Sequence, residues 1–130
     1  SAQCAVRVAL DLPPDAALRS LPDDVAVNLY RVVQEALSNI AHHAEARLTT
    51  IRLAWERARL ILTIQDDGRG FVVPATFHDL TTNGHFGLVG MQERAGLIGA
   101  DWVVDSTPGC GTTVRVVWQA PARDPEPAAS

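Results

Sequence analysis

The stretch that does most to decide the fold is RVVQEALSNIAHHA, residues 31–44. It belongs to an amphipathic segment that we expect to form a helix over about 25–44, with Asp23 or Asp24 as its N-cap. At about 100° per residue, one stripe of this helix is apolar and consists of Val25, Leu29, Val33, Ala36, Leu37 and Ile40. The opposite stripe is polar and consists of Asn28, Arg31, Glu35, Asn39 and His42, with His43 at its edge. One face should therefore pack on a core while the other presents a carboxylate, a carboxamide and imidazoles.

The segments on either side of this helix are mostly rich in β-forming residues. Strands are expected at residues 4–10, 48–55, 60–65, 102–105 and 112–118. Residues 56–59 join the second and third strands as a hairpin, and residues 87–98 have the spacing of a second helix. Residues 72–86 show no clear period, and loops of that length are usually functional or mobile.

Length and composition indicate one globular domain of 130 residues, with 47% hydrophobic and 20% charged residues. The net charge is −4, which argues against direct nucleic-acid binding. All 11 basic residues are arginine, so a lysine-bearing P-loop and a lysine-based kinase pocket are excluded. No apolar run approaches the ~20 residues of a membrane span, so we expect no membrane contact by this domain. Two distant cysteines and no CxxC predict free thiols in the cytoplasm and no structural zinc.

A first candidate constellation is Glu35 with Asn39, one helical turn apart on the polar stripe. An asparagine oxygen suits Mg2+ that keeps most of its waters and takes its other ligands from phosphates. A glutamate can orient or deprotonate a nucleophile. The alternative is an ordinary solvated helix face, because both residue types are common there.

A second candidate is the segment 66–70, Asp-Asp-Gly-Arg-Gly, directly after a predicted strand. Asp66 at a strand end can accept a hydrogen bond from an exocyclic amine such as that of adenine, and glycines let the backbone approach a flat ring closely. The alternative is a tight turn, since Asp-Gly is common turn chemistry.

Two glycine-rich segments complete the set. Residues 84–91 open a helix, whose free N–H groups and positive dipole end favour anions. Residues 109–113, Gly-Cys-Gly-Thr-Thr, lie between the last two strands. They are either a plain hairpin turn or a means of placing a threonine hydroxyl beside the ligand-binding aspartate.

In this order and spacing, the four segments resemble the GHKL ATPase superfamily, and most of all the catalytic ATP-binding domain of bacterial sensor histidine kinases of the nitrate-sensor-like subgroup. Residues 31–44 resemble the N box, 66–71 the G1 box, 87–94 the G2 box and 109–112 the closing Gly-Thr segment. The resemblance covers residues 4–119. It implies an α+β fold, a two-layer α/β sandwich of the Bergerat type with a mixed, mainly antiparallel sheet and helices on one face.

The resemblance also implies roles for individual residues. Asn39 would coordinate Mg2+, Glu35 would polarise the incoming nucleophile, and Asp66 would bind the adenine amine. The remaining nucleotide-binding positions would be Gly68 and Gly70 at the base, Thr112 beside Asp66, Gly87, Leu88 and Gly90 at the phosphates, and His42 and His43. His42 stands where the family often has lysine or arginine, so phosphate affinity would be modest or pH-dependent. Residues 72–86 would form a lid over ATP.

Residues 1–119 are thus expected to be a histidine-kinase-like catalytic domain, followed by a disordered tail rich in proline and alanine at 120–130. With ATP and Mg2+ it would phosphorylate a histidine on a separate dimerisation segment of the same, possibly membrane-anchored, sensor, for relay to a response regulator. No such segment is seen before residue 4, so we expect a fragment of a longer protein. The alternatives are a stand-alone serine kinase of the anti-sigma-factor type and a nucleotide-binding regulatory module without phosphotransfer.

Overall fold

The structure is a computed structural model that describes residues 7–14, 18–19, 21–41, 46–70 and 88–121. These residues form the strands β1 (Arg7–Asp11), β2 (Leu48–Glu56), β3 (Arg59–Asp66), β4 (Asp101–Ser106) and β5 (Thr112–Gln119), and the helices α2 (Asp23–Asn39) and α4 (Leu88–Leu97). Each element expected from the sequence is present, and most bounds differ from the expected ones by one to three residues. Ala120, which we expected to belong to the tail, donates its N–H to the carbonyl of Ala58. Residues 122–130 lie outside the described part.

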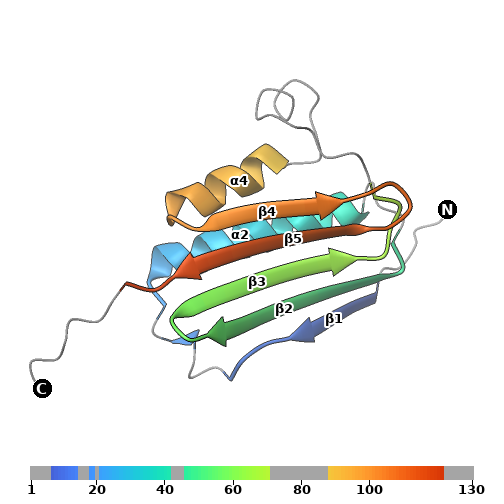
Figure 1. The fold of residues 1–130 in the computed structure, drawn as a ribbon. Helices are drawn as coiled ribbons and strands as arrows, with labels where there is room; N and C mark the ends of the chain where they lie inside the picture. The colour runs from blue at the N-terminus through green and yellow to red at the C-terminus, as the bar shows by residue number, and fades with distance from the viewer. Residues whose placement is uncertain (1–6, 15–17, 20, 42–45, 71–87, 122–130) are drawn as a thin grey trace, which may run out of the picture.

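The strands form one sheet in the order β1-β2-β3-β5-β4. β1 pairs with β2 in parallel, and the other three pairings are antiparallel. The parallel pair requires a crossover connection, and the chain makes it through α2. Both helices lie on the same face of the sheet (Figure 1). The expected two-layer α/β sandwich with a mixed, mainly antiparallel sheet is confirmed.

The core lies between the sheet and the two helices. Because side chains alternate between the faces of a strand, every second residue of the central strands points to the helices. The buried apolar residues of the strands include Ile51, Leu60, Leu62, Ile64, Val114, Val116 and Trp118. They meet Val25, Leu29, Val32 and Ala36 of α2 and Leu88, Met91 and Ala95 of α4. This packing fixes how α2 and α4 are presented at the surface.

Helix α2 differs from the expected helix in three ways. The residue at its N-cap is Pro22 and not an aspartate, although Oδ1 of Asp24 accepts a hydrogen bond from the N–H of Val25 at 3.0 Å. Its α-helical part ends at Asn39, while residues 42–44 of the expected helix lie outside the described residues. The prediction that Asn28 is exposed is wrong, because its side chain is buried and its Nδ2 donates to the carbonyl of Asp24 at 2.8 Å. The buried stripe is rotated toward Val32, which is fully buried.

Candidate functional site

The two helices bring Glu35 and Gly90 together. Both residues are half-buried, and a Cβ atom on Gly90 would lie 3.8 Å from Oε2 of Glu35. The carboxylate of Glu35 therefore lies close to the first turn of α4, at ordinary van der Waals distance from the Cβ position of Gly90. Two predicted site residues, 55 positions apart in sequence, meet in this way.

Asn39 is the last residue of α2, and it is half-buried. It follows Glu35 by four residues, so the two side chains lie on neighbouring turns of one helix face. Leu88 begins α4, but its side chain is only 2% exposed and belongs to the core. At Leu88, only the backbone is available to a ligand. His42, His43, Gly87 and the expected lid at 72–86 lie outside the described residues.

Asp66 is the last residue of β3 and is one of the few buried polar residues, at 7% exposure. Its Oδ1 accepts a hydrogen bond of 2.7 Å from the N–H of Gly68. Burial raises the pKa of the Asp66 carboxyl, although N–H donors from Gly68 and Thr112 partly offset that effect. The chain thus holds a carboxylate in a largely dry position, where a donor on a ligand would be strongly favoured.

Thr112 is the register partner of Asp66 across β3 and β5, next to it as the family resemblance implied. Its hydroxyl lies 2.7 Å from the hydroxyl of Ser106, which also donates to the carbonyl of Gly111 at 3.1 Å. Thr112 is therefore next to Asp66 and is held by the end of β4. Ser106 was not singled out from the sequence, because only the pairing of β4 with β5 brings it there.

The turn between β4 and β5 is locked onto the loop that follows Asp66. The N–H of Gly109 donates to the carbonyl of Arg69 at 2.6 Å. Gly70 has φ +66°, and a Cβ there would overlap the carbonyl of Thr107. Gly111 has φ +81°, and a Cβ there would lie 2.2 Å from the carbonyl of Asp66. Close backbone contact with a second loop therefore accounts for glycine at both Gly70 and Gly111.

Asp67 is a further residue that sequence reasoning missed. Its Oδ1 accepts hydrogen bonds from the N–H groups of Arg47 at 2.8 Å and Leu48 at 3.0 Å, and these bonds lower the pKa of its carboxyl. Its own N–H donates to the carbonyl of Leu48. The loop carrying Asp66 is thus fixed to the start of β2 on one side and to the β4–β5 turn on the other.

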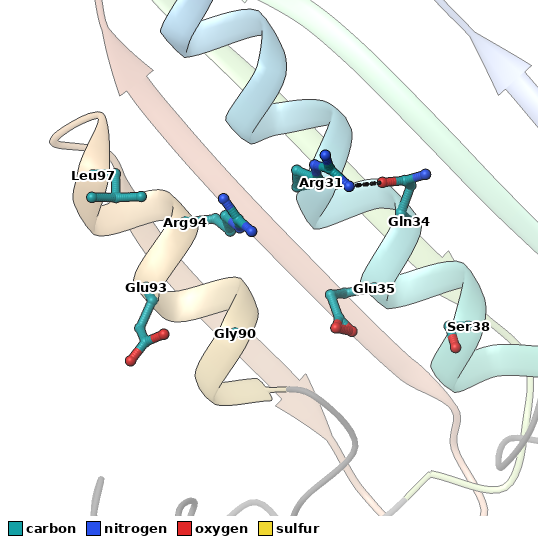
Figure 2. A pocket seen from close by; sticks show the side chains of 8 residues that line it. All are labelled: Arg31, Gln34, Glu35, Ser38, Gly90, Glu93, Arg94 and Leu97. Carbon is teal, nitrogen blue, oxygen red and sulfur yellow. Dashed lines mark hydrogen bonds between the residues drawn. The ribbon is translucent and has the colours of Figure 1, made fainter.

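A groove of about 580 Å³ runs between α2 and α4. It is lined by Arg31, Gln34, Glu35, Ser38, Gly90, Glu93, Arg94 and Leu97 (Figure 2). The guanidinium of Arg31 donates to Oε1 of Gln34 at 3.3 Å. Because Glu35 and Gly90 both line this groove, it opens beside the predicted catalytic carboxylate.

No group of three or more His, Cys, Asp or Glu that would enclose a metal ion occurs among the residues that the structure describes. A single amide oxygen at Asn39, beside the carboxylate of Glu35, suits a Mg2+ ion that arrives with its waters and the phosphates of a nucleotide. The amide of Asn39 therefore suits a Mg2+ ion that arrives with a nucleotide. None of the described helices is long and apolar enough to cross a membrane.

Comparison with solved structures supports the fold. An Erythrobacter litoralis blue-light activated histidine kinase matches with a TM-score of 0.70 at 24% identity, over 89% of this chain and 36% of that protein. The ATP-binding domain of PrrB from Mycobacterium tuberculosis matches with a TM-score of 0.62 at 21% identity, over 90% of this chain and 82% of that structure. One neighbour is a histidine kinase, and the other is an ATP-binding domain.

Sequence comparison identifies the family. The signal transduction histidine-protein kinase/phosphatase DegS of Brevibacillus brevis is 36% identical over 97 residues, which are 73% of this chain and 23% of that protein. The sensor protein VraS of Staphylococcus epidermidis is 36% identical over 96 residues, 74% of this chain and 26% of that protein. The chain thus spans about a quarter of these relatives, and the nitrate-sensor-like subgroup stays a prediction. Residues 24–122 match the model of the histidine kinase-, DNA gyrase B-, and HSP90-like ATPases, and the chain belongs to this family.

Proposed function

We propose that this domain binds ATP with Mg2+ and transfers the γ-phosphoryl group to a histidine on a separate dimerisation segment, from which a response regulator receives it. The observation that carries the proposal is the position of the Glu35 carboxylate beside the first turn of α4, in the groove that Gly90 also lines. It joins a potential proton acceptor on one helix to the helix start that, by resemblance, shapes the phosphate end of the site.

Each site residue has a separate role in this proposal. The buried carboxylate of Asp66 accepts a hydrogen bond from the adenine amine, and Thr112 lies at its side. Asn39 supplies a ligand to Mg2+, which neutralises phosphate charge when bound. Glu35 accepts the proton of the attacking imidazole as the bond from imidazole nitrogen to phosphorus forms and the bond from phosphorus to the β–γ bridging oxygen breaks. ADP then leaves with that oxygen.

The partners follow from the same chemistry. The acceptor histidine would belong to another segment of the same sensor, because the relatives are about four times longer than the matched part. The second partner would be a response regulator. The use of ATP is consistent with a cytoplasmic domain, and its net charge of −4 favours neither nucleic acid nor an anionic membrane as a partner.

The proposal is tested by separating nucleotide binding from transfer. Asn39→Ala should remove the Mg2+ dependence of ATP binding and, with it, phosphotransfer. Glu35→Ala should keep ATP–Mg2+ affinity within a few-fold but slow transfer by roughly 10²–10⁴, the usual effect of a positioned acid–base group. Affinity is measured by calorimetry with and without Mg2+, and transfer by radiolabelling of the parent sensor.

The isolated domain serves as the control in the labelling experiment. It should bind ATP without gaining a stable phosphoryl label, because its acceptor is on another segment. The division of roles is wrong if Glu35→Ala weakens binding as much as Asn39→Ala does. Labelling of the isolated domain on one of its own four histidines would contradict a separate acceptor.

A further inference from the structure

The α4 side of the groove consists of residues that share one helix face. Gly90, Arg94 and Leu97 follow one another at spacings of four and three residues, which places them on the same side of α4. In Figure 2 the Arg94 side chain extends from α4 toward α2, on the side where Glu35 lies. Arg94 is exposed, and within the described part of the chain it makes no hydrogen bond or ion pair.

In the proposed reaction a cationic side chain at this end of the groove would offset phosphate charge in addition to Mg2+. Glu35 is a carboxylate, and a bound triphosphate adds several negative charges next to it. The chain has no lysine, and the described groove residues include two arginines. One nitrogen of Arg31 donates to Gln34, whereas Arg94 has no competing partner among the described residues, so Arg94 is the stronger candidate to meet an anion.

We propose that Arg94 binds the γ-phosphoryl group of ATP and stabilises the charge that develops on it during transfer; this inference rests on the proposed function. Arg94 lies four residues after Gly90, about 6 Å along the helix axis, a distance that an arginine side chain can span. Helical side chains also lean toward the N-terminus of their helix, which here is the Gly90 end. The nucleophile must lie within hydrogen-bond reach of Glu35 and next to phosphorus, which places the γ-phosphoryl group near Glu35. Arg94 extends into the same groove and lies near that group as well.

This role makes a specific prediction about ATP and ADP, which differ by the γ-phosphoryl group alone. Arg94→Met keeps much of the side-chain volume and removes the charge. It should weaken binding of the non-hydrolysable analogue AMPPNP at least about tenfold, as expected for loss of a hydrogen bond to a charged group, and leave ADP binding within twofold. Arg94→Lys, which keeps the charge but loses the planar fork, should fall between wild type and Arg94→Met.

Arg31→Met is the matched control, because it removes the other groove arginine. It should leave the ratio of AMPPNP to ADP affinity at the wild-type value. All affinities are measured by calorimetry with Mg2+ on the domain as it stands, with circular dichroism to verify folding.

The outcomes separate this inference from the function on which it rests. If the wild-type domain binds AMPPNP and ADP but Arg94→Met changes neither affinity, or both equally, Arg94 does not contact the γ-phosphoryl group and the proposed function is untouched. An equal loss of selectivity in Arg31→Met would assign the effect to the general charge of the groove and overturn the role of Arg94. If the wild-type domain binds neither nucleotide, both proposals fail.

Discussion

Replacing Gly111 by alanine tests whether the β4–β5 turn holds Asp66 in its place. A Cβ at Gly111 would lie 2.2 Å from the carbonyl oxygen of Asp66, whereas an ordinary contact begins at 3.4 Å. Relieving the overlap must therefore move the turn or the end of β3 by about 1.2 Å. Because Asp66 is the last residue of β3, its carboxylate is expected to move with the strand end.

The chain offers a matched control at Gly109. This glycine has φ +85°, close to the φ of +81° at Gly111, but nothing lies within 4 Å of its Cβ position. Gly109→Ala should therefore lower the free energy of unfolding only by the cost of a left-handed backbone at a residue with a side chain, roughly 1–2 kcal/mol. Gly111→Ala adds overpacking of about 1–3 kcal/mol, so its free energy of unfolding should fall by the larger amount.

The two variants should also differ in nucleotide binding. Hydrogen bonds form over a window of about 2.7–3.2 Å, so a shift of this size takes Asp66 out of reach of a bound base. ATP affinity should fall at least about tenfold in Gly111→Ala and stay within threefold in Gly109→Ala. Urea unfolding gives the stability, and calorimetry at a temperature where both variants are folded gives the affinity. Equal losses of affinity in both variants would refute the coupling between the turn and Asp66.

Two further predictions concern pH and have opposite signs. Burial raises the pKa of the Asp66 carboxyl. The protonated carboxyl therefore stabilises the fold fully below the ordinary carboxyl pKa, about 3.9. This contribution is lost as the pH rises through the pKa of the folded state. Asp66→Asn should therefore have a higher free energy of unfolding than wild type at pH 7. Urea unfolding at a pH below the ordinary carboxyl pKa should show no such difference. Hydrogen bonds lower the pKa of Asp67, so its contribution is present above the ordinary value and is lost as the pH falls through the folded pKa. Asp67→Ala should be less stable than wild type at pH 7, with a deficit that shrinks in acid; a constant deficit across the pH series would contradict the role given to its carboxylate.

The elements of this fold were predictable because their signals are local. Alternating side chains define β3 and β5, a two-residue turn at Arg57 and Ala58 joins β2 to β3, and the glycine-rich segments mark the loops. The position of Thr112 beside Asp66 was implied by the family resemblance, and the pairing of β3 with β5 accounts for it. Each of these features depends on residues close in sequence or on the pairing of adjacent strands.

The features that escaped prediction depend on how distant elements pack. Val32 is fully buried and Asn28 nearly so, because the sheet and α4 decide which side of α2 faces inward, and the apolar period alone allowed a different rotation. The bonds of Asp67 to Arg47 and Leu48 span about twenty residues. The groove beside Glu35 exists only because α4 lies next to α2, so Arg94 was predicted only as the end of the segment resembling the G2 box and not as a groove residue.

The central claim is that Asp66 selects an adenine nucleotide, and a comparison of ATP with GTP tests it most directly. Adenine presents an amine donor where guanine presents a carbonyl acceptor, and a buried carboxylate facing that acceptor would leave both groups without a donor. Calorimetry of the wild-type domain with Mg2+ should give at least about tenfold tighter binding of ATP than of GTP. In Asp66→Asn, whose amide offers both a donor and an acceptor, the preference should shrink to a few-fold. Equal affinities of the wild-type domain for ATP and GTP, or a preference that survives unchanged in Asp66→Asn, would contradict the account.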